Sequence, residues 1–127
     1  MKQILNGFKG LHEVKAMHRD FKLANLLVHN KVVKIADLGF AKQLEKEQSL
    51  TTTQLGTGVT MAPEVLDGKE YGMYADIWSI GTVYYQMLHG VYPFNGQSDV
   101  EIRRKIERRI IPYSKSIKIS DNARDFI

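Results

Sequence analysis

The sequence predicts one mainly α-helical domain that carries a small β-hairpin. Its 127 residues fall within the usual size of a single domain, and a hydrophobic fraction of 43% is enough to fill one core. Apolar side chains recur at helical spacing in several segments, whereas one short segment is rich in β-branched residues. We therefore expect a single globular unit over residues 1–127.

An amphipathic helix is predicted at the start of the chain. Ile4, Phe8 and Leu11 recur at spacings of three to four residues, as one face of a helix requires. No capping pattern precedes Ile4, which favours a chain that begins inside a larger domain.

A β-hairpin and a long loop are predicted next. Residues 26–28 and 32–36 carry β-branched side chains and flank the turn sequence at 29–31. Residues 43–60 are polar, with three consecutive threonines and two glycines, and they hold neither a helical nor a strand period. We expect a long surface loop there, and loops of that length usually carry function.

A buried helix is predicted over residues 74–89, which are apolar nearly all round. The segment ends at Gly90, with Pro93 soon after, which is a typical helix stop. Its most apolar stretch, residues 77–88, falls short of the ~20 residues that a membrane span needs. We expect this helix to form the centre of the core, and we expect no membrane segment.

Two further helices are predicted towards the C-terminus. Ser98 and Glu101 form a capping-box pattern, and the helix after them extends to about Arg109. Ser120 or Asp121 caps one more helix, which the end of the chain leaves incomplete. The apolar face of the first of these helices consists of Ile102, Ile106 and Ile110.

Composition and charge restrict the class of protein. The absence of cysteine excludes disulfides, thiolate zinc sites and cysteine nucleophiles. No signal-peptide core follows the N-terminus. We therefore expect a cytoplasmic protein, with the nucleus as the alternative. The net charge is +4, and no aromatic side chains interleave with the main basic cluster, so we expect no nucleic acid as partner. A solvated helix face is the simpler interpretation of this cluster, and a phosphate-binding patch is the alternative. The cluster consists of Arg103, Arg104, Lys105, Arg108 and Arg109.

The segment His18-Arg19-Asp20-Phe21-Lys22-Leu23-Ala24-Asn25 lies between the first helix and the hairpin, where a loop can aim several polar side chains at one point. Transfer of a phosphoryl group needs a carboxylate that accepts the proton of the attacking hydroxyl, a cation that holds the phosphate, and oxygen ligands for magnesium. Asp20, Lys22 and Asn25 supply these three types of side chain.

A second carboxylate is expected beside this loop. Asp37 follows the second predicted strand directly, so its side chain emerges close to the loop that precedes the first strand. Asp37 and Asn25 are therefore candidates to share one metal ion. Two oxygen ligands together with substrate phosphates suit Mg²⁺, which keeps several of its waters.

With these residues the chain resembles the eukaryotic protein kinase family, whose catalytic-loop pattern H-R-D-x-x-x-x-N is matched in full by residues 18–25. D-L-G at 37–39, A-P-E at 62–64 and D-I-W-S-I-G at 76–81 follow in the family's order and at its spacing. Four such motifs together argue against coincidence. The resemblance covers nearly the whole chain and implies a kinase-like C-terminal lobe, of an α+β family, with the small lobe absent.

The resemblance implies roles for the matching residues. Asp20 is the catalytic base, and Lys22 contacts the γ-phosphate of ATP. Asn25 and Asp37 bind magnesium and belong with Lys22 to the ATP site, where Leu27 packs beneath the adenine. The implied cofactors are ATP and Mg²⁺.

Two features of the resemblance favour serine and threonine as the residues phosphorylated in protein substrates. Lys22, two places after the aspartate, follows the Ser/Thr pattern, whereas tyrosine kinases usually have alanine or arginine there. Thr57 resembles the threonine that bonds the catalytic aspartate and lysine in Ser/Thr enzymes.

Arg19 beside the catalytic aspartate is the mark of kinases that are activated by phosphorylation of the activation loop, since a guanidinium pairs bidentately with a phosphate. Thr53 is the candidate phosphosite, with Thr51 or Thr52 as alternatives, and Lys42 would add a second cation. An upstream activating kinase is then an expected partner.

Some positions depart from the family's pattern. Leu38 replaces the usual phenylalanine and keeps an apolar side chain of smaller volume; with His18 it occupies the family's internal hydrophobic spine. Gly58 replaces a common proline and Thr60 a common tyrosine, so the surface that receives the substrate next to the phosphorylated residue is altered.

Larger parts of the family's pattern are not found in the sequence. It has no G-x-G-x-x-G loop, no V-A-I-K strand lysine and no helix-C glutamate. We also expect the last helices of the lobe to be missing. The arginine that pairs in the family with the glutamate corresponding to Glu64 would be missing with them. The main interpretation is a fragment of a Ser/Thr kinase catalytic domain that phosphorylates proteins in its full-length context and is inactive alone. There are two alternatives. One is a catalytically silent, truncated or pseudokinase-like module that acts by docking proteins, and the other is an incomplete record of a longer gene product.

Overall fold

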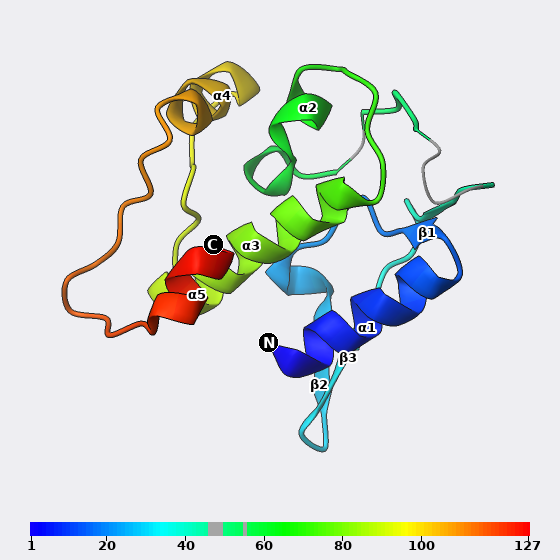
Figure 1. The fold of residues 1–127 in the computed structure, drawn as a ribbon, viewed down its shortest axis with the longest axis horizontal. Coiled ribbons are helices and arrows are strands. Elements are labelled where there is room, and N and C mark those ends of the chain that lie inside the picture. The colour runs from blue at the N-terminus through cyan, green and yellow to red at the C-terminus, as the bar shows by residue number, and fades with distance from the viewer. Residues whose placement is uncertain (46–49, 55) are drawn as a thin grey trace.

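The computed structural model describes residues 1–45, 50–54 and 56–127, and it is mainly helical with two small two-stranded sheets. The long helix α3 runs through the centre, with α1 and the β2–β3 hairpin on one side and α2 and α4 on the other (Figure 1). The elements are α1 Lys2–Glu13, β1 Ala16–Met17, the 3₁₀ helix η1 Leu23–Asn25, β2 Leu26–His29, β3 Val32–Ile35, β4 Lys42–Gln43, the 3₁₀ helix η2 Gly58–Thr60, α2 Pro63–Leu66, α3 Tyr74–His89, α4 Asp99–Glu107 and α5 Asp121–Phe126.

The amphipathic helix at the start of the chain is confirmed as α1. Its Ile4 and Phe8 are buried, and they pack in one cluster with Phe21 of the following loop and with two residues of α3, Ile80 and Val83. The ring of Phe8 meets that of Phe21 edge to face, with centroids 4.8 Å apart. This cluster joins the first helix, the 18–25 loop and the central helix.

The predicted hairpin is confirmed as β2 and β3, but β3 ends at Ile35, one residue earlier than predicted, and the turn differs. His29 pairs with Val32, so β2 is one residue longer than expected and the turn consists of Asn30 and Lys31 alone. Both turn residues have positive φ, 48° and 63°, as the tight two-residue turns of right-twisted hairpins require.

The expected surface loop over residues 43–60 is only partly correct. Gln43 pairs with Ala16 in the short antiparallel ladder of β1 and β4, and Leu44 is buried in the core. Thr51 pairs with Tyr71 in an isolated bridge with two hydrogen bonds of 2.9 Å. These pairings join residues far apart in the sequence, and nothing in the local pattern indicates them. Residues 46–49 and 55 of this segment lie outside the described residues.

The central helix is confirmed as α3, which ends at Gly90 in the left-handed conformation. Residues 79–83 in its middle are buried all round the helix, as the uniform apolar pattern predicts, and exposure is confined to positions nearer its ends. Ile80 and Val83 are fully buried, whereas Tyr74 and Ile77 are exposed because the neighbouring elements cover only part of the helix surface. No helix in the described ranges is long and apolar enough to cross a membrane.

The two helices near the C-terminus are confirmed with different limits. In α4, the Ser98 side chain accepts a hydrogen bond from the Glu101 backbone N–H, as the capping box predicts, but the helix ends at Glu107. The prediction that Ile110 belongs to its apolar face is wrong, since that side chain lies beyond the helix end and is 71% exposed. For α5 the cap is Ser120.

Candidate functional site

A carboxylate of the central helix, Asp76, fixes the start of the 18–25 loop. Asp76, which is 2% exposed, accepts hydrogen bonds from the backbone N–H groups of His18 and Arg19, at 2.9 and 3.0 Å. These bonds hold Arg19 at a φ of +68°, a conformation that non-glycine residues seldom adopt. Sequence reasoning missed this role of Asp76, although a single carboxylate inside an apolar helix was a usable signal.

Three polar side chains, those of Asp20, Lys22 and Thr57, contact one another in the site. The Lys22 Nζ atom lies 2.7 Å from Asp20 Oδ2, and the Thr57 hydroxyl donates to Asp20 Oδ1 at 2.9 Å. Lys22 Nζ also lies 3.3 Å from Thr57 Oγ1, which closes a triangle. Because Asp20 is only 3% exposed, the ammonium and the hydroxyl compensate its lost hydration. The structure thus brings together three predicted site residues, one of them 37 positions away.

Asn25 lies beside this triangle and is tied to the hairpin. Its side-chain amide donates to the Asp20 backbone oxygen at 2.9 Å, so its side-chain oxygen is the atom left to act as a ligand. Its backbone oxygen accepts from Ala36 N at 2.8 Å, and Ala36 O lies 3.0 Å from the ring Nε2 of His18. Ala36, the residue before Asp37, is therefore hydrogen-bonded to both His18 and Asn25, the two ends of the 18–25 loop.

Asp37 leaves the end of β3 in an unusual conformation. Its φ is +60°, its side chain is exposed, and its Oδ1 accepts from Gly39 N at 3.3 Å. Amide and carboxylate oxygens such as those of Asn25 and Asp37 are the donor types that Mg²⁺ prefers. Across the described ranges, no three or more His, Cys, Asp or Glu side chains group into a metal cage.

Several apolar side chains on and around the hairpin are exposed. Leu27, on β2, is 56% exposed. His18 is fully buried, whereas Leu38, its expected neighbour in an internal spine, is 51% exposed. The other exposed apolar side chains on this part of the chain are Leu23, Val28, Val32 and Phe40.

The threonines of the 51–53 run differ in accessibility. Thr51 is 6% exposed and its hydroxyl accepts from Lys42 Nζ at 2.9 Å, whereas Thr52 and Thr53 are exposed. The Thr53 hydroxyl lies 3.4 Å from that of Thr51, so the Thr51 hydroxyl links Lys42 to Thr53. Arg19 donates through Nε to Phe40 O at 2.6 Å, which leaves its terminal guanidinium nitrogens for any other partner.

The chain is similar to known proteins over nearly its whole length. The family described as "Protein kinase domain" matches residues 1–127. Calcium-dependent protein kinase 4 of Plasmodium falciparum is 36% identical over 134 residues, which cover 100% of this chain and 25% of that protein. Mitogen-activated protein kinase kinase kinase 1b of Physcomitrium patens is 42% identical over 131 residues, 99% of this chain and 16% of its own length.

A third relative, serine/threonine-protein kinase atg1 of Dictyostelium discoideum, is 38% identical over 115 residues, 87% of this chain and 17% of that protein. The chain therefore belongs to the protein kinase family, and its relatives support the serine/threonine type. It spans about a quarter or less of the length of these curated relatives.

Proposed function

We propose that residues 1–127 are the C-terminal-lobe part of a Ser/Thr protein kinase catalytic domain, which in its full-length context transfers the γ-phosphate of ATP to protein hydroxyls. The observation that carries the proposal is the triangle of Asp20, Lys22 and Thr57. It places a buried carboxylate, a cation and a hydroxyl at one point, on a loop pinned by the central helix. Transfer of a phosphoryl group depends on such positioning and on electrostatic stabilisation.

Asp20 would accept the proton as the substrate hydroxyl oxygen bonds to the γ-phosphorus and the bond to the β-phosphate oxygen breaks. Each of its two oxygens already accepts one hydrogen bond, and a carboxylate has about four acceptor positions, so capacity for the substrate remains. Lys22 would hold the transferred phosphate, and Thr57 keeps the lysine and the carboxylate in register.

The side-chain oxygens of Asn25 and Asp37 would hold magnesium. Mg²⁺ bound there would neutralise the charge on the phosphate oxygens of ATP. The bond from Asn25 to the Asp20 backbone and the bond from Ala36 to Asn25 hold this part of the site against the triangle. Leu27 would offer its exposed side chain to the adenine.

Thr53 would be the activating phosphosite, and an upstream kinase would modify it. It is exposed, unlike Thr51, and Lys42 lies within one hydroxyl of it. Mass spectrometry of the active form should find phosphate on Thr53. Active protein with Thr51, Thr52 and Thr53 all unmodified would contradict this.

The test compares Mg²⁺-dependent ATP binding and phosphotransfer to a generic Ser/Thr substrate in three proteins: the longest natural form, this chain, and the longest form with Asp20→Asn. We expect activity from the longest form alone. If the longest form neither binds ATP nor transfers phosphate, the fold serves protein docking, as in the silent-module alternative, and the enzymatic proposal is wrong.

A further inference from the structure

The basic residues of α4 are not equally neutralised. Arg103 makes a two-pronged ion pair with Asp67, through Nε at 2.5 Å and through Nη2 at 3.0 Å, and it also contacts Glu107 at 3.2 Å. Lys105 lies 3.3 Å from Glu101 and donates to the backbone oxygen of Asn95. Both cations are therefore already used within the fold.

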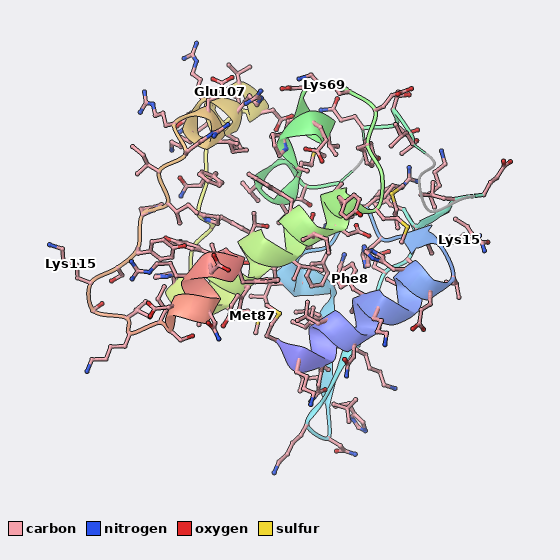
Figure 2. The ribbon with its side chains drawn as sticks, viewed as in Figure 1. Phe8, Lys15, Lys69, Met87, Glu107 and Lys115 are labelled. Carbon is pink, nitrogen blue, oxygen red and sulfur yellow. The ribbon has the colours of Figure 1, made fainter. Side chains whose placement is uncertain are left out.

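Three arginines of the same region remain. Arg104, Arg108 and Arg109 are exposed and have no ion-pair partner within the described ranges 1–45, 50–54 and 56–127. Arg104 and Arg108 are four residues apart, so like charges stack along the end of the helix, which weakens a helix slightly. Long side chains tipped with nitrogen project outward from α4 near Glu107 (Figure 2). Within the described part of the chain, this repulsion is therefore not offset by an ion pair.

A hollow of about 280 Å³ lies beside Arg108. Its basic edge consists of Lys105 and Arg108, and its apolar wall includes Phe94, Pro112 and Ile110. Ile110 is 71% exposed, so an occupant that covered this large apolar side chain would remove apolar area from water. A surface that combines a basic edge with an apolar hollow suits a ligand that carries both negative charge and an apolar group.

We propose that the surface formed by Arg104, Arg108 and the hollow under Ile110 is a docking site for an extended acidic segment of a partner protein, with a large apolar side chain next to the acidic residues. Guanidinium groups bind carboxylates in a fixed, often bidentate geometry. Arg104 and Arg108 lie one helical turn apart, at about 5–6 Å between Cβ atoms. Alternate residues of an extended peptide are about 6.8 Å apart on one face, which is within reach of both.

The chemistry of the hollow favours a peptide over a nucleic acid. Single-stranded nucleic acids bind through bases that stack on exposed aromatic rings beside the cations. Phe94, the aromatic residue in the wall of this hollow, is only 6% exposed and stacks on Trp78. An aliphatic or aromatic side chain of a peptide fits an apolar hollow without needing such a ring. The proposal does not depend on phosphotransfer, so it can stand or fall independently of the proposed kinase activity.

The test measures binding of a short fluorescein-labelled peptide, with glutamates at alternate positions followed by leucine, by fluorescence anisotropy. We expect Arg104→Ala with Arg108→Ala to weaken binding by about tenfold or more, and added salt to weaken it further. Replacing the peptide's glutamates by glutamine, or its leucine by alanine, should weaken binding too. Circular dichroism should show the double variant folded, because it removes a repulsion and no internal bond.

Lys115→Ala with Lys118→Ala is the matched control, since both lysines are exposed and the same charge is removed from the loop after the hollow. We expect this control to bind the peptide within about twofold of the unaltered chain. The proposal is overturned if the unaltered chain does not bind the peptide, if the arginine variant binds it equally well, or if the lysine control loses as much affinity. Tighter binding of a uridine oligonucleotide to the same arginines would also overturn it.

Discussion

Asp76 places a carboxylate inside an apolar helix, where an unpaired charge would be costly. Its two oxygens accept the N–H groups of His18 and Arg19, so the charge is compensated and the loop gains a fixed backbone. The residues with catalytic types of side chain are aimed from this loop. At the residue scale, the site therefore depends on a side chain that touches none of them directly.

Asp76→Asn should destabilise the fold by about 1–3 kcal/mol, because the amide can accept only one of the two backbone hydrogen bonds and leaves a buried donor facing another donor. Urea denaturation measures the free energy of unfolding. Asp121→Asn, in the exposed first turn of α5, is the control and should change it little. Equal effects of the two substitutions would argue against the anchoring role.

Thr57 offers a second prediction at this scale, which rests on the proposed function. Thr57→Ala removes the hydroxyl that bonds Asp20 and lies beside Lys22, whereas Thr57→Ser keeps it. A hydrogen bond to a charged group is worth about 1.5–3 kcal/mol, so we expect phosphotransfer by the longest natural form to fall by roughly 10- to 100-fold in the alanine variant. The serine variant should stay close to the unaltered enzyme. A serine variant as impaired as the alanine variant would show that the hydroxyl is not the cause.

At the scale of elements, α4 is joined to the turn after α2 by one ion pair. Arg103 bonds both oxygens of Asp67, and Lys69 bonds the same carboxylate at 2.8 Å. In Figure 2, the turn that carries Lys69 lies next to the helix that carries Glu107. The hydrogen bonds from Arg103 and then Lys69 hold the pKa of Asp67 well below its usual range, and Asp67 in turn raises the pKa of Arg103.

This pKa shift predicts a pH-dependent contribution to stability. Because the folded-state pKa of Asp67 is lowered, its contribution is present above the unfolded-state pKa of about 4 and is lost as the pH falls towards the folded-state value. Arg103→Gln should therefore destabilise the chain at pH 7, and the difference from the unaltered chain should shrink below about pH 4. Urea titrations at pH 7 and at acidic pH measure it. Arg104→Gln, which has no such partner within the described part of the chain, should show no comparable difference at either pH.

At the scale of the whole molecule, α3 organises the fold (Figure 1). The cluster around Ile80 and Val83 joins α3 to α1 and to the loop that carries Asp20. A second cluster joins Trp78 of α3 to Phe94 and to the buried isoleucines of α4. Packing against one helix thus determines where the catalytic-type residues and the basic surface of α4 lie.

Ile80→Ala should lower the free energy of unfolding by about 2–5 kcal/mol, because it leaves a cavity where α1, the 18–25 loop and α3 meet. Ile77→Ala on the same helix is the control, since Ile77 is 43% exposed and should cost much less. Thermal or urea unfolding of the two variants measures the difference. Similar losses at both positions would mean that α3 is not buried as described.

The sequence by itself determined the elements whose periodicity is local: α1, the β2–β3 hairpin, α3 and the capped start of α4. It also determined the residue types of the candidate site, because these lie in short contiguous motifs such as 18–25 and 37–39. Hydrophobic spacing, turn residues and caps act within a few residues of one another, so a linear sequence displays them directly.

Only the tertiary structure decided which distant residues meet. It brought Asp76 to the 18–25 loop and Tyr71 to Thr51, and it paired β1 with β4. The contact of Thr57 with Asp20 was expected from the family resemblance, and residue spacing did not indicate it. The tertiary structure also decided that Ile77 and Ile110 stay exposed although their neighbours in the pattern are buried. These outcomes depend on how helices and loops cover one another in space, and residue spacing along the chain does not encode that cover.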